Sequence, residues 1–187
     1  LDDSVVMVIN NKPRFIRRSR GYVPEPIHCE SIEGTPILAM GSDLKNAFAL
    51  NKGNEILIGP HIGDLENAST HETLEWTINR YENLFSIEPE KIIIDSHPQF
   101  FSSHLGEHIG ASSQIPVVTV QHHHAHIASV MAEHNLIGPV LGIAMDGTGY
   151  GPDGTIWGGE FLLCKGNQYQ RLAHIYGAPL PGGEKAV

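Results

Sequence analysis

Hydrophobic and polar positions change their period several times along this chain, and each change predicts a strand or a helix. Short apolar runs separated by polar turns predict three consecutive strands, at residues 36–40, 47–50 and 55–58. Apolar side chains then recur at helical spacing as far as Phe85, which predicts a helix over residues 67–85.

Strands and helices alternate in the next part of the chain. Apolar runs predict strands at residues 91–94 and 115–120, and helical patterns predict helices over residues 100–109 and from residue 122 to about 135. This alternation predicts an α/β domain, with a mixed sheet flanked by helices.

The first thirty residues have a different pattern. Residues 4–9 and 14–18 alternate like two strands around a polar turn, which predicts a short β-hairpin, and residues 21–26 form a Pro-containing linker. We therefore expect residues 1–30 to end an upstream domain and residues 31–187 to form the main one.

Composition and charge narrow the class of protein. The chain has 187 residues, of which 41% are hydrophobic, and this is enough for one domain core. Its net charge of −9 disfavours nucleic-acid binding as the main task, and no apolar run is as long as a membrane span. Cys29 and Cys164 follow no disulfide or metal pattern, so we expect a cytoplasmic location, with Cys164 a buried thiol on its strand.

Four histidines in five positions open the last predicted helix. His122 and His126 lie four residues apart, so they share a helix face and can bind one divalent metal, iron or zinc. The glutamate that zinc proteases carry beside their first histidine is missing, which disfavours a protease. His123 and His124 are expected to support the ligands or to face a substrate, although an exposed chelating tract would have the same composition.

A Gly-rich loop follows the apolar strand predicted at residues 140–144. Asp146 can hold a cation at the strand end, while Gly147, Thr148 and Gly149 offer amides and a hydroxyl to a phosphate. The Pro-Asp-Gly run that ends the loop is typical of a plain hairpin turn, so both interpretations stay open. Residues 155–163 then predict the returning strand.

Two further loops carry candidate chemistry. Gly41, Lys45 and Asn46 follow the first strand of the main domain, where a lysine can neutralise a phosphate, although a turn has the same composition. His97 follows another strand end and is a candidate catalytic residue, with helix capping by Asp95 or Ser96 as the alternative. We expect Lys45 and Asp146 to face one cleft.

Several motifs together resemble the HypF family of carbamoyltransferases from NiFe-hydrogenase maturation. They are VQHHHAHIAS at residues 120–129, DGTGYGPDG at 146–154, WGGEF at 157–161 and PLPGG at 179–183. The resemblance covers the whole chain. It implies an actin-like ATPase fold, related to ribonuclease H, for residues 31–187, and it implies that residues 1–30 end a YrdC-like domain.

The resemblance also implies an activity. Family members transfer a carbamoyl group from carbamoyl phosphate, through carbamoyl adenylate made with ATP and Mg²⁺, to the C-terminal cysteine of the partner HypE. In this chain Lys45, Asp146 and His97 would be the catalytic residues, and His122, His126 and Asp146 the metal ligands. Family members continue well beyond residue 187, so we expect the chain to be a fragment, with a truncated second lobe, that is inactive alone.

Other functions also agree with these residues. A metal-dependent phosphohydrolase would use the same histidine pair and Asp146 without a partner protein. A small-molecule O-carbamoyltransferase would share the metal-binding helix, and a non-catalytic metal carrier would need only the histidines.

Overall fold

The computed structural model describes residues 3–30, 32 and 34–177. The chain divides into two compact units, Leu1–Val120 and Gln121–Val187. Within the described part, no helix combines the length and the apolar character needed to cross a membrane. The PLPGG motif lies outside the described residues.

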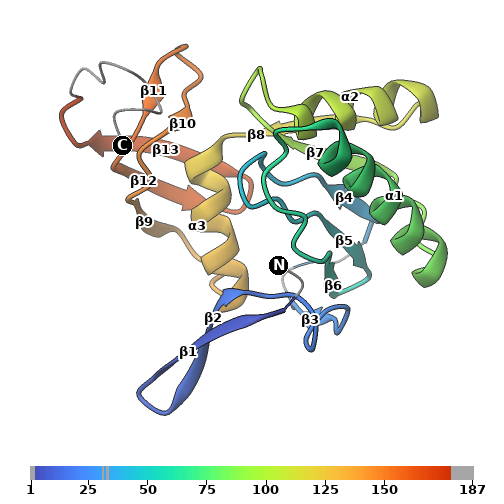
Figure 1. Ribbon diagram of the computed structural model, residues 1–187. Coiled ribbons are helices and arrows are strands. Elements are labelled where there is room, and N and C mark those ends of the chain that lie inside the picture. Colours follow the sequence, from blue (N-terminus) through green and yellow to red (C-terminus); the bar gives the residue numbers. More distant parts are fainter. Residues whose placement is uncertain (1–2, 31, 33, 178–187) are drawn as a thin grey trace. The chain divides into compact units, whose positions relative to one another are not determined.

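The first unit opens with the expected β-hairpin. Strands β1 (Val5–Ile9) and β2 (Lys12–Arg17) pair antiparallel and form a sheet of their own (Figure 1). Asn10 and Asn11 both have positive φ angles of 51° and 58°, a conformation that asparagine tolerates in a tight hairpin turn. Most of the hairpin's side chains are exposed.

A six-stranded sheet forms the body of the first unit, in the order β3-β6-β5-β4-β7-β8. Its strands are β3 (Ile27–His28), β4 (Ile37–Ala39), β5 (Ala49–Lys52), β6 (Glu55–Ile58), β7 (Lys91–Asp95) and β8 (Val117–Val120). The first four pair antiparallel, whereas β7 lies parallel to β4 and β8 parallel to β7. The mixed sheet expected from the sequence is therefore confirmed.

Helices α1 (Ala68–Phe85) and α2 (Phe101–Ser113) pack on this sheet (Figure 1). Leu74 of α1 and Leu105 of α2 belong to the same buried cluster as Leu38 and Ile92 of the sheet. A Cβ atom on Gly106 would lie 2.5 Å from Cγ2 of Ile94, so glycine lets α2 approach the strands closely. The carboxyl ends of β4 and β7 lead into the loops that hold the candidate residues of this unit.

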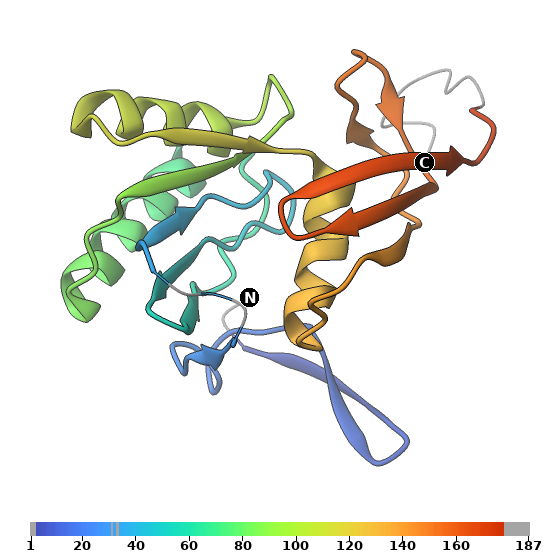
Figure 2. The same cartoon turned by 180° about the vertical axis from the view of Figure 1, so that it is seen from behind.

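The second unit pairs one helix with a small antiparallel sheet. Helix α3 (His122–Glu133) packs across β9 (Val140–Ala144) and β12 (Glu160–Lys165), and β13 (Gln168–His174) completes the order β13-β12-β9 (Figure 2). Ile127 and Met131 of the helix are buried with Leu162 and Cys164 of the sheet. A separate ribbon of β10 (Gly149–Tyr150) and β11 (Ile156–Trp157) lies in the Gly-rich loop.

Some boundaries differ from those predicted. The strand expected over residues 155–163 is two strands, β11 and β12, because the chain turns at Gly159, whose φ is +66°. Helix α2 runs four residues further than expected, and its last turn ends at Gln114 in the left-handed conformation. Short β3 and β10, and the longer β13, were not predicted.

Candidate metal centre and loops

Three predicted metal ligands meet in the second unit. His122 and His126 lie one turn apart on α3, and their Nε2 atoms are 3.2 Å apart. Oδ2 of Asp146, just after β9, lies 3.4 Å from Nε2 of His122. Ligand atoms of all three residues lie within 4.8 Å of one another.

The two distances from Nε2 of His122, 3.2 and 3.4 Å, fit ligands of a single metal ion. In a tetrahedral site with metal–ligand bonds of about 2.1 Å, neighbouring ligand atoms are about 3.4 Å apart. In addition, Oδ2 of Asp146 is buried without a hydrogen-bond partner, although a buried carboxylate oxygen normally has one. Two imidazole nitrogens and a carboxylate oxygen form a donor set that iron or zinc accepts.

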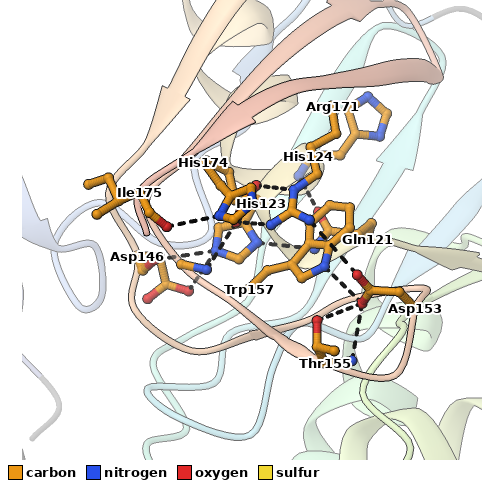
Figure 3. A network of polar contacts seen from close by, with 12 residues as sticks. Gln121, His123, His124, Asp146, Asp153, Thr155, Trp157, Arg171, His174 and Ile175 are labelled. Carbon is orange, nitrogen blue, oxygen red and sulfur yellow. Dashed lines mark hydrogen bonds and ion pairs between the residues drawn. The ribbon is translucent and has the colours of Figure 1, made fainter. Parts of the chain in front are cut away.

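His123 and His124 point into the second unit. The side chain of His123 is fully buried, and its Nε2 atom lies 3.3 Å from the carbonyl oxygen of Asp146 (Figure 3). His124 is 6% exposed, and its Nε2 atom lies 3.3 Å from the carbonyl oxygen of Gly166. Burial lowers the pKa of His124. Neither residue belongs to an exposed chelating tract.

The Gly-rich loop divides into an open part and a packed part. Gly147 and Thr148 are exposed, and a Cβ on Gly147 would have open space around it. Gly149 is buried, and a Cβ there would lie 2.2 Å from Cε1 of His123. A phosphate can therefore approach Gly147 and Thr148, whereas Gly149 lets the loop pack on His123.

A network of polar side chains supports this loop, and our sequence reasoning did not assign it. The carboxylate of Glu160 is fully buried and accepts two hydrogen bonds from Arg171, at 2.6 and 2.8 Å. These bonds raise the pKa of Arg171, whose guanidinium also stacks on Trp157 at 3.9 Å. Hydrogen bonds from the Thr155 hydroxyl and the Trp157 indole lower the pKa of Asp153 to about 2 (Figure 3).

A cavity of about 450 Å³ adjoins the ligand group. It lies between α3 and β9, and both His126 and Asp146 line it. Its other walls are mainly apolar, with Val130 and Leu141 among them. A small molecule in this cavity would lie beside the ligand atoms of His126 and Asp146.

In the first unit, the loop after β4 is folded tightly. The amide nitrogen of Asn46 donates to the carbonyls of Met40 and Ser42, and its side chain is 1% exposed. Lys45 is exposed and has a φ angle of +50°, held by a hydrogen bond from its backbone N–H to Asp64. Asn46 thus holds the loop closed, and the side chain of Lys45 is exposed, so a ligand role for Lys45 stays a prediction.

His97 lies in the turn after β7. Its backbone N–H donates to Asp95, its Nδ1 atom accepts from the backbone of Gln99, and its ring stacks on Phe100. The alternative interpretation, capping of α2 by Asp95 or Ser96, is wrong. Asp43 instead accepts from the first amides of the helix, at 2.7 and 2.9 Å.

The structure thus brings His122, His126, Asp146, Gly147, Thr148 and Gly149 together in one unit. Gly41, Lys45, Asn46 and His97 lie in the other unit. That Lys45 and Asp146 face one cleft stays a prediction.

Comparison with known proteins decides the family. The HypF Kae1-like domain matches residues 33–133, and the second subdomain of the carbamoyltransferase Kae1-like domain matches residues 142–187. The chain belongs to the HypF family. The resemblance seen in its motifs is thereby confirmed.

Individual HypF proteins match along the whole chain. Carbamoyltransferase HypF of Synechocystis is 45% identical over all of this chain, which corresponds to 24% of the relative. The crystal structure of full-length HypF in the phosphate- and nucleotide-bound form is 45% identical, with a TM-score of 0.92 over 99% of this chain and 24% of that one. HypF of T. kodakarensis is 40% identical, with a TM-score of 0.89 over 99% of this chain and 24% of that one.

The chain spans about a quarter of the length of these HypF proteins. The match in fold is nevertheless close, and it agrees with the actin-like lobe expected from the sequence.

Proposed function

We propose that this chain is the part of a HypF carbamoyltransferase that holds the carbamoyl donor and passes the carbamoyl group to its acceptor. The donor is carbamoyl adenylate, made from carbamoyl phosphate and ATP with Mg²⁺, and the acceptor is the C-terminal cysteine of HypE in the cytoplasm. Family membership supports the reaction class. The single observation that carries the proposal is the ligand group of His122, His126 and Asp146.

Each candidate residue has a defined task in this proposal. His122, His126 and Asp146 hold a divalent ion, which supplies positive charge for a phosphate or carbamoyl oxygen. The backbone N–H of Gly147 and the hydroxyl of Thr148 donate hydrogen bonds to phosphate. Lys45 contributes an ammonium group, and His97 contacts the carbamoyl group.

The transfer itself exchanges one bond for another. The cysteine thiol of the acceptor loses its proton to water, and the thiolate attacks the carbamoyl carbon. A carbon–sulfur bond forms, the bond from that carbon to the phosphate oxygen breaks, and AMP leaves with the electron pair. The protein residues stabilise the charge that develops on the carbamoyl and phosphate oxygens.

A chimeric enzyme tests this proposal. The 187 residues of this chain replace the matching segment of Synechocystis HypF, and mass spectrometry follows carbamoylation of the HypE cysteine. We expect transfer by the chimera and its loss in His122→Ala and His126→Ala variants. His134→Ala is the matched control, because this exposed histidine follows α3 outside the ligand group.

Other outcomes favour the alternative functions. Phosphate release from simple phosphate esters without HypE would indicate a metal-dependent phosphohydrolase. Carbamoylation of a small hydroxyl compound in place of HypE would indicate a small-molecule O-carbamoyltransferase. Transfer at an unchanged rate in both histidine variants would contradict the proposed site.

A further inference from the structure

His123 is a buried histidine with no task in the proposed reaction. Its side chain is fully buried, and its ring packs against Gly149, where a Cβ would lie 2.2 Å from Cε1. Its Nε2 atom is 3.7 Å from Oδ2 of Asp146, one of the proposed ligands (Figure 3). A histidine that only filled space would not need its polar atoms.

Hydrogen bonds determine which ring nitrogen of His123 carries hydrogen. The backbone N–H of His124 donates to Oε1 of Gln121 at 2.9 Å, and a backbone N–H can meet only an acceptor there. The other end of the same amide is therefore the NH₂ group. It donates to Nδ1 of His123 at 3.0 Å and to the carbonyl of Tyr150 at 3.3 Å. Because Nδ1 accepts, the hydrogen of the imidazole is on Nε2.

Nε2 of His123 points at the main chain of Asp146. It donates to the carbonyl oxygen of Asp146 at 3.3 Å, and the backbone N–H of Gly159 donates to the same oxygen at 3.1 Å. The main chain of Asp146 is thus held by hydrogen bonds from two sides. Its Oδ2 atom makes none and stays within 3.4 Å of His122.

We propose that His123, oriented by Gln121, is a positioning residue that fixes Asp146 so that its carboxylate oxygen meets the ligand nitrogens of His122 and His126. This inference rests on the metal site of the proposed function and adds the residues that orient it. Metal ligands must lie within a few tenths of an ångström of their bonding distances, and residues that orient them typically change metal affinity about 10- to 100-fold.

Two substitutions separate positioning from packing. The side-chain amide of a glutamine reaches the place of Nε2, where its nitrogen can donate, whereas that of an asparagine ends near Nδ1, where its oxygen can accept from Gln121. His123→Gln therefore keeps a donor for Asp146, and His123→Asn keeps only the contact with Gln121. If His123 only filled space, the two variants would behave alike, wherever their side-chain amides lie.

Cobalt binding to the 187-residue chain measures the effect. Co²⁺ reports its ligands through its visible absorption spectrum, and titration gives its dissociation constant. We expect His123→Gln to keep the spectrum and affinity of the natural chain. His123→Asn should weaken binding about 10- to 100-fold. Equal affinities in the two variants would overturn the proposal.

Two measurements on the metal-free chain test the same contacts without relying on the ion. Nitrogen NMR of His123 should show hydrogen on Nε2, and hydrogen exchange of the Gly159 amide should be faster in His123→Asn than in His123→Gln. Hydrogen on Nδ1, or equal exchange in both variants, would contradict the positioning role.

A His122→Ala variant separates this inference from the metal site itself. If it binds Co²⁺ as well as the natural chain does, the metal proposal fails. The NMR and exchange results then still decide whether His123 positions Asp146.

Discussion

Replacing Arg171 with methionine should destabilise the second unit strongly. Arg171 is the main partner of Glu160, whose side chain is fully buried. Without the guanidinium, the carboxylate retains the backbone N–H of Gly158 as a donor, at 3.1 Å. A buried carboxylate with so few donors is unfavourable, because it has lost the hydration that it had in the unfolded chain.

The expected loss can be estimated from this geometry. Removing one partner of a buried ion pair typically costs about 3–5 kcal/mol. The side chain of Arg171 is 26% exposed, so water can reach the vacated space, and the lower end of this range applies. Loss of the stacking on Trp157 adds about 0.5–1 kcal/mol. We therefore expect the free energy of unfolding to fall by about 3–4 kcal/mol.

Tryptophan fluorescence can follow this unit by itself. The chain has two tryptophans, and Trp157 lies in the second unit, whereas Trp76 lies on α1 in the first. In a Trp76→Phe background, emission during urea unfolding reports the burial of Trp157. In the chain that keeps Trp76, Arg80→Met is a matched control followed by circular dichroism, because Arg80 stacks on the exposed Trp76. It should change stability by less than about 1 kcal/mol.

A double-mutant cycle checks the reasoning. Adding Glu160→Gln to Arg171→Met removes the buried charge, and this should restore about half or more of the lost stability. If Arg171→Met lowers stability by less than about 1 kcal/mol, or if the second substitution restores nothing, the pair does not stabilise this unit as argued.

Further predictions concern the metal, the proposed chemistry and the response to acid. His126→Ala should remove most bound iron or zinc by elemental analysis, and unchanged metal content would contradict the ligand assignment. In the chimeric enzyme, Lys45→Met and Asp146→Asn should each slow carbamoyl transfer about a hundredfold or more while the melting temperature is kept. The lowered pKa of Asp153 adds stability above about pH 4, and this is lost as the pH falls towards about 2. Asp153→Asn should therefore flatten the pH dependence of unfolding in that window, and an unchanged slope would count against the assigned hydrogen bonds.

Local patterns of apolar residues in the sequence determined those helices and strands whose apolar side chains pack in the core. The apolar run of β7 and the helical spacing along α1 predicted both elements close to their observed bounds. The pairing of His122 with His126 also follows from sequence, because residues four apart share one helix face. The histidine helix and the Gly-rich loop could thus be predicted as one metal-binding group.

Interactions between distant residues could not be predicted in this way. Asp43 caps α2 from 58 positions away in the sequence. Asp95 and Ser96, which lie just before the helix, were the candidate caps in the sequence. Arg171 lies on β13, a strand that was not predicted. It donates to Glu160, which cannot be told from an exposed glutamate by its sequence context. A charged residue gives no local sign that the fold will bury it.

The histidine run shows the same limit within a few residues. Sequence alone determined that four imidazoles lie near one helix start, and left open whether His123 and His124 face solvent, ligand or core. The tertiary structure decided this by packing Gly149 and the Gly166 turn against α3, which buried both rings. The physical reason is that the side chains of a helix point in all directions around its axis. Only the packing of neighbouring elements determines which of them are buried away from water.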